Sequence, residues 1–121
     1  MANTFKVVTF AAEPASAGTP YVMYTVASGT TTVVLGLILS NINTSAVTAE
    51  VELVSTTSSR GGVNNVANGT SFLIKDVSIP TGSSLEILSG GKVVLEAGDK
   101  IQIDCSVADK LSGTLSIMEI T

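Results

Sequence analysis

The sequence predicts an all-β protein: one domain over residues 1–121, built as a two-sheet sandwich or jelly roll of eight to nine antiparallel strands. Three observations lead to this prediction. The length suits a single domain, which can bury about two-thirds of its unfolded surface without a disulfide or a metal. Hydrophobic residues make up 45% and charged residues 13% of the chain, and the abundant Val, Ile and Thr favour pleated strands. Short apolar runs alternate with turn residues at regular spacing, as in sandwiches.

Four runs in the first half have the composition of strands: Phe5–Phe10, Tyr21–Ala27, Thr30–Asn41 and Val47–Leu53. The stretch "VVLGLIL" in the third run is apolar throughout, which predicts a strand buried on both faces. Gly36 in its middle indicates a bulge or a close backbone approach. The fourth run alternates cleanly, with Glu50 and Glu52 on the polar side, which is typical of a strand with one buried face.

The second half contributes five further runs: Ser71–Ile79, Ser83–Leu88, Lys92–Glu96, Lys100–Val107 and Thr114–Ile120. Before them, the polar residues of about 55–70 predict a projecting loop, since loops this long are uncommon in compact domains. The residues 108–113 are expected to form a turn before the last run.

The stretch "LEAGDKIQIDC" gathers three carboxylates, a lysine and the only cysteine, so it is either a reactive site or a turn between strands. Gly98 can adopt a positive φ and Asp99 can bond its own backbone, which favours the turn. Cys105 alternates in phase with Ile103, so we expect a small buried apolar residue. A reactive thiol would need a basic or histidine neighbour, and the chain has no histidine.

The two terminal strands are the expected places for contact with other chains, because terminal strands often lie at sheet edges. In the last run, Leu115 and Ile117 are out of phase with Met118 and Ile120, which indicates either a bulge or a strand covered on both faces, as at a subunit contact. The candidate interface residues are Phe5, Val7, Met118, Ile120 and Arg60, the last because an arginine in the polar loop can hold a partner's carboxylate.

The chain has few of the residue types that catalysis and metal binding usually require. The lack of histidine removes the commonest general base and metal ligand, and a single cysteine excludes zinc ribbons. Acids alone can hydrolyse a glycoside, and Asp99, Asp104 or Asp109 could supply ligands for an unspecific surface calcium site. The hydrolase candidates are Glu50, Glu52, Glu86, Glu96, Asp99, Asp104 and Glu119. We expect solvated faces there instead, and therefore no enzyme, no metal and no cofactor.

The charge and the N-terminal sequence argue against nucleic acid and membranes as partners. The net charge of −4 with six scattered Lys and Arg disfavours nucleic acid, whose phosphates need clustered cations. The N-terminus "MANTFKVVTF" shows no signal peptide, and the longest apolar run is far shorter than the roughly 20 residues of a membrane-spanning helix. The sequence thus predicts synthesis in the cytoplasm and no membrane partner.

The stretch "FLIKDVSIPTGSSLEILSGGKVVLEAGDKIQIDCSV", together with "TTTVVLGLILSN" and the C-terminal "LSIMEIT", resembles small proteins from the structural-gene region of tailed bacteriophages. The resemblance covers nearly the whole chain and is poorest at the Asn- and Gly-rich insert, residues 59–70. Its motifs are structural rather than catalytic. The resemblance implies a virion structural protein, with no activity or cofactor carried over.

These observations predict a non-enzymatic virion protein, made in the host cytoplasm, that associates with itself and with other virion proteins. It would serve as a capsid decoration or cement protein or as a ring component of the neck or tail. Sparse charge and a mean hydropathy of +0.50 agree with extensive contact surfaces. The alternative is a carbohydrate- or receptor-binding β-sandwich module, which would need an exposed aromatic platform.

Overall fold

The computed structural model describes residues 2–55, 69–88 and 91–121, and in those ranges it contains nine strands in two antiparallel sheets. The first sheet consists of β1 (Asn3–Glu13), β9 (Leu111–Ile120), β3 (Thr31–Asn41), β6 (Ser84–Glu86) and β7 (Val93–Leu95). The second sheet consists of β2 (Tyr21–Thr25), β8 (Lys100–Cys105), β4 (Val47–Val54) and β5 (Thr70–Ile79). The predicted all-β sandwich is confirmed.

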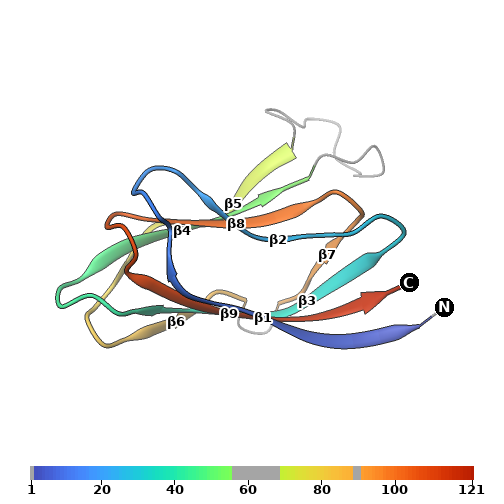
Figure 1. Cartoon of the computed structure of the whole chain (residues 1–121), viewed down its shortest axis with the longest axis horizontal. Helices are drawn as coiled ribbons and strands as arrows, with labels where there is room; N and C mark the ends of the chain where they lie inside the picture. The colour runs from blue at the N-terminus through green and yellow to red at the C-terminus, as the bar shows by residue number, and fades with distance from the viewer. Residues whose placement is uncertain (1, 56–68, 89–90) are drawn as a thin grey trace.

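The chain winds between the two layers, which lie one above the other in Figure 1. The first sheet has the order β1-β9-β3-β6, with β7 pairing along a different stretch of β3, and the second has the order β2-β8-β4-β5. Successive strands therefore cross repeatedly from one sheet to the other, as in a jelly roll. Both termini lie at the same end of the molecule, at the ends of β1 and β9 (Figure 1).

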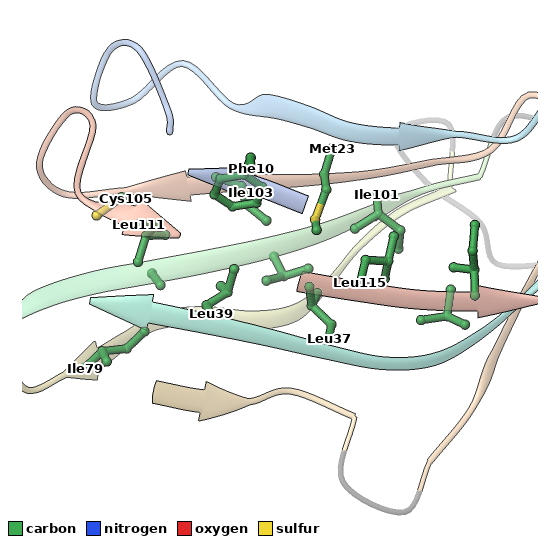
Figure 2. Close-up of a cluster of buried hydrophobic side chains, with 14 of the residues drawn as sticks. Phe10, Met23, Leu37, Leu39, Ile79, Ile101, Ile103, Cys105, Leu111 and Leu115 are labelled. Carbon is green, nitrogen blue, oxygen red and sulfur yellow. The ribbon is translucent and has the colours of Figure 1, made fainter. Parts of the chain in front are cut away.

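The core lies between the inner faces of the two sheets. Figure 2 shows side chains from both layers meeting there, with Leu37 and Leu115 from the first sheet and Ile101 and Ile103 from the second. Cys105 is 3% exposed in this core, so the prediction that it is a buried apolar residue is confirmed.

Strand β3 differs from its prediction. The bulge expected near Gly36 is present, because the register with β9 shifts between Val34 and Gly36. The predicted burial on both faces is wrong: Leu37 is fully buried, but Leu35 and Ile38 are 36% and 42% exposed. The physical reason is that each sheet of a two-layer sandwich packs one face against the other sheet. No element of the described chain packs on the outer face of β3.

Strand β9 also differs from its prediction. It begins at Leu111, so part of the turn expected at residues 108–113 is strand. It is not an edge strand, because it pairs with β1 on one side and β3 on the other, whereas β1 is an edge as expected. Its apolar pattern does not come from a bulge in β9, because Leu115 and Ile117 face the core and Met118 lies on the opposite face. The alternative, that another subunit covers this outer face, stays a prediction.

The connections follow the local chemistry of the sequence. Gly98 has φ 91°, and Asp99 accepts a hydrogen bond from the Glu96 backbone N–H at 3.0 Å, so "LEAGDKIQIDC" is a strand, a turn and a strand as predicted. Most of the predicted polar loop of residues 55–70, including Arg60, lies outside the described residues. No helix long and apolar enough to cross a membrane occurs in the described part of the chain.

Substitution of Gly113 on β9 would test how tightly the core is packed. A Cβ at this position would overlap the ring of Phe10 on the neighbouring β1, whereas a Cβ at Gly36 would meet nothing within 4 Å. We expect Gly113→Ala to lower the free energy of unfolding by about 1–3 kcal/mol, because the ring must leave its packed position. Urea denaturation measures the loss, with Gly36→Ala as the matched control of small effect. Equal effects of the two substitutions would contradict this account of the packing.

Candidate functional site

The outer face of the first sheet carries a row of apolar side chains across four strands. In the strand register, Phe5 of β1 lies opposite Met118 of β9, Met118 opposite Val33 of β3, and Val33 opposite Val94 of β7. Directly opposed residues in a sheet project from the same face and lie close enough to touch. We call these four residues the apolar row.

The apolar row is accessible to a partner. Phe5 is 73% exposed and Val94 is 61% exposed, at the two ends of the row, while Met118 and Val33 between them are half-buried. Alternation along β1 places Val7, 63% exposed, on the same face. Large side chains of this kind stay in contact with water unless another molecule covers them.

The two outer faces of the sandwich differ in chemistry. On β1, β9 and β3 the outward ladder positions hold only apolar, hydroxyl or amide side chains. On the second sheet the outward positions include Glu50 opposite Asp104, and Glu52 accepting a hydrogen bond from Gln102 at 2.7 Å. Charged residues are typically depleted from the centre of protein interfaces, so the first sheet presents the face suited to contact.

The structure brings together four of the five residues that the sequence predicts for an interface. Phe5, Val7, Met118 and Ile120 all project from the outer face of the first sheet, although β9 is not the edge strand it was expected to be. Arg60 lies outside the described residues. Whether these residues form an interface stays a prediction.

Sequence reasoning missed the other half of the apolar row. Val33 was assigned to a strand buried on both faces, and Val94 was not singled out. Only the pairing of β7 with β3 sets these two side chains beside each other. Their sequence signal is weak, because an apolar run such as "VVLGLIL" or "KVVLE" does not reveal which residues face outward.

A polar cluster closes the end of the sandwich beside this face. Tyr24 from the second sheet donates a hydrogen bond to the Glu119 carboxylate of β9 at 2.6 Å, and Lys6 of β1 makes an ion pair with the same carboxylate at 2.6 Å. The Tyr24 oxygen lies 2.8 Å from the Thr32 hydroxyl, which must donate because the tyrosine proton is already used. We call these four residues the end clasp.

The end clasp fixes the ionisation of its members. The hydrogen bonds from Lys6 and Tyr24 lower the pKa of Glu119 below its ordinary value of 4.5. Burial, together with the hydrogen bond to Glu119, raises the pKa of Tyr24 to about 12. Glu119 is therefore a structural carboxylate that holds two strands of one sheet and one of the other, rather than an acid poised for catalysis.

A hollow of about 210 Å³ on the charged face gathers three acids. Glu50 of β4 lies opposite Asp104 of β8, and Asp76 of β5 joins them from an irregular position with φ 51°. Two of these acids were hydrolase candidates in the sequence, whereas Asp76 was missed because only the bulged pairing of β5 turns it toward β4.

Two of the acids in the hollow have hydrogen-bond or ion-pair partners within the protein. Asp104 Oδ1 accepts hydrogen bonds from the backbone N–H groups of Gly18 at 3.1 Å and Cys105 at 2.8 Å, and Lys75 pairs with Glu50 at 3.3 Å. Burial and the neighbouring Asp76 raise the pKa of Glu50. Within residues 2–55, 69–88 and 91–121, no group of three acid, cysteine or histidine side chains is arranged to hold a metal ion.

The five aromatic residues do not form a sugar-binding platform. Phe5 and Phe72, at 73% and 47% exposure, are the two exposed ones, and they lie on different sheets. Lys75 covers the Phe72 ring at 4.5 Å. Phe10 is buried and packs edge-on against Tyr21 with ring centroids 5.4 Å apart. The carbohydrate-binding alternative thus gains no support from this arrangement.

Comparison with known proteins assigns no family to this chain. No family model matches the chain, and no curated protein matches it. A solved structure that does match belongs to Bacillus endospore appendages, described as a novel family of disulfide-linked pili. That chain is 17% identical with a TM-score of 0.47, and the match covers 99% of this chain and 87% of that one. A likeness of this degree carries no conclusion about fold or function. None of these comparisons supports the bacteriophage setting, which stays an expectation.

The end clasp predicts a specific loss of stability in acid. Because the folded pKa of Glu119 is lowered, its contribution is present above pH 4.5 and is lost as the pH falls through the folded value. We expect Glu119→Gln to lower the free energy of unfolding by about 2 kcal/mol at neutral pH, as for other charged hydrogen bonds. The difference should shrink toward strong acid.

Urea denaturation at several values between about pH 2 and pH 7 measures this difference. Glu86→Gln, at an exposed position on β6, is the matched control and should follow the unsubstituted protein. A deficit of Glu119→Gln that stayed constant over the whole range would show that the carboxylate charge is not what stabilises the clasp.

Proposed function

We propose that this protein is a non-enzymatic structural subunit that associates with further copies of itself through the outer face of the first sheet. The observation that carries the proposal is the apolar row, with Phe5 and Val94 exposed at its ends on a face whose outward ladder positions on β1, β9 and β3 hold no charge. Burying such a surface is favourable, and no part of the described chain covers it.

A second copy of the chain is the occupant that the chemistry favours. The outward positions of β1, β9 and β3 can meet those of a second copy without opposing like charges, even though the protein as a whole has a net charge of −4. On β6 of the same sheet, the exposed Glu86 lies opposite Ile38 and would have to stay outside such a contact. A face that meets its own copy is an isologous contact, the commonest arrangement in soluble oligomers. The acidic outer face of the second sheet then remains in water and keeps the assembly soluble.

The setting we propose is the particle of a tailed bacteriophage, where the subunit would act in capsid decoration or cementing, or in a ring of the neck or tail. The support for this is the resemblance of the sequence to small phage structural proteins. A particle component needs contact surfaces and stability rather than a reacting group. The lack of histidine, the burial of Cys105 and the backbone hydrogen bonds to Asp104 agree with a protein that catalyses nothing.

The apolar row predicts the effect of placing charge on it. We expect Met118→Lys together with Ile120→Lys, and separately Val94→Lys, to weaken self-association about tenfold or more, because each buries an unpaired charge at the contact. Light scattering after size exclusion, over a series of concentrations, measures the mass. Val94 is the safer position for folding, since its side chain is 61% exposed.

Val22→Lys is the matched control, because Val22 is also an exposed valine, at 41%, but lies on the second sheet. It should leave the oligomer mass unchanged. If Val94→Lys and Val22→Lys both kept the mass of the unsubstituted protein, the outer face of the first sheet would not be the interface.

The proposed setting makes a separate prediction. Mass spectrometry of purified particles from the source phage should find this chain in many copies, and labelled antibody should place it on the head, neck or tail. Its consistent absence from purified particles would reject the virion role while leaving self-association untouched.

A further inference from the structure

The backbone of β1 has one side paired and one side open. Ala2 and Thr121 exchange both backbone hydrogen bonds, at 3.1 and 2.9 Å, and the register with β9 then runs unbroken from Asn3 to Phe10. In an antiparallel pair, hydrogen-bonded and non-hydrogen-bonded residues alternate. The N–H and C=O groups of Asn3, Phe5, Val7 and Thr9 therefore point away from β9.

These peptide groups form a regular free edge. All four residues are exposed, and within the described chain no backbone hydrogen bond is found for them on this side. Their spacing of two residues over eight residues of even register is what a further strand requires for continuous pairing. Phe5 and Val7 also place their side chains on the apolar outer face.

The other edges of the sandwich carry features that prevent such pairing. Strand β5 shifts register twice against β4 and has Asp76 at φ 51°, and β2 has five residues with a bulge. Strands β6 and β7 have three residues each. Short strands and bulges are the usual means by which proteins protect sheet edges, and β1 has neither between Asn3 and Phe10.

We infer that β1 pairs antiparallel with β1 of a second copy, through the free peptide groups of Asn3, Phe5, Val7 and Thr9. The inference rests on the proposed self-association and adds a second contact to the outer face, along the edge of β1. An antiparallel pair of identical strands is related by a two-fold axis, so one edge satisfies the other and the contact closes as a dimer. The first sheets of the two copies become one continuous sheet.

Lys6 limits the register of this pairing. It is the charged residue within Asn3–Phe10, its side chain faces inward, and its ammonium group is held by Glu119 at 2.6 Å. An axis beside Lys6 would set two lysines directly opposite each other, which is unfavourable. An axis beside Phe5 or Val7 places Lys6 opposite Thr4 or Val8 of the other copy and keeps the two charges apart.

The same pairing extends the apolar row. A two-fold axis perpendicular to the sheet leaves both outer faces on the same side, so the rows of the two copies become parts of one surface. That surface can then contact further copies or other particle proteins. The edge ladder thus supplies direction and register, while the outer face supplies the apolar area.

Amide hydrogen exchange of the unsubstituted protein tests the ladder directly. At concentrations where light scattering shows an oligomer, the amides of Phe5, Val7 and Thr9 should exchange slowly, and on dilution to the monomer they should exchange freely. The amides of Lys6 and Val8, which face β9, are the internal control and should stay protected throughout. Fast exchange at Phe5, Val7 and Thr9 in the oligomer would overturn the inference.

A pair of substitutions at one position separates the backbone from the side chain. Val7→Pro removes a donor on the free edge and leaves the pairing with β9 intact, so we expect dimerisation to weaken about tenfold or more, since both copies lose a bond. Val7→Thr keeps the donor and the branched shape and should preserve the dimer. Circular dichroism and thermal melting establish that both variants are folded.

The outcomes distinguish the two proposals. A monomer at every concentration of the unsubstituted protein would reject self-association, and with it both the proposed function and the ladder. An oligomer that Val94→Lys dissociates but Val7→Pro does not would retain the proposed function and reject the ladder. An oligomer lost in Val7→Pro and kept in Val7→Thr would support the ladder.

Discussion

Each sheet of this protein can bury only one of its faces against the other, and this constraint governs both its stability and its surface. The inner faces supply a dry core in which Leu37, Leu115, Ile101 and Ile103 are nearly inaccessible to water. Every apolar residue of opposite phase is left outside. On the second sheet those positions are largely polar, but on the first they include the apolar row. The exposed apolar side chains are therefore concentrated on one side of the molecule.

The edges of the sandwich are unequal in a way that matches this asymmetry. Bulges, short strands and an irregular Asp76 interrupt the edges of β2, β5, β6 and β7. Only β1 among the described edges offers a long even ladder, and it belongs to the sheet with the apolar outer face. Free peptide groups and exposed apolar side chains therefore occur on the same strand, which is the combination that directs association rather than leaving it nonspecific.

The end clasp links this edge to the stability of the fold. Glu119 receives hydrogen bonds from Tyr24 of the second sheet and Lys6 of β1, so one carboxylate joins three strands and both layers. By holding Lys6, it also keeps a cation of the edge strand turned toward its own subunit. In the hollow, Asp104 has a comparable structural role, because it accepts backbone hydrogen bonds from Gly18 and Cys105.

The sequence by itself determined the all-β class, the two-layer arrangement and most strand positions, because alternation and turn residues are local signals that each strand carries in its own residues. It also identified the turn at Gly98 and Asp99 and the burial of Cys105 for the same reason. Only the tertiary structure decided that β9 is central and that β3 is open on one side. It alone brought Val33 and Val94 into line with Phe5 and turned Asp76 toward Glu50. These features depend on which strands pair and in what register, and such long-range pairings are set by the packing of the whole core rather than by any local pattern.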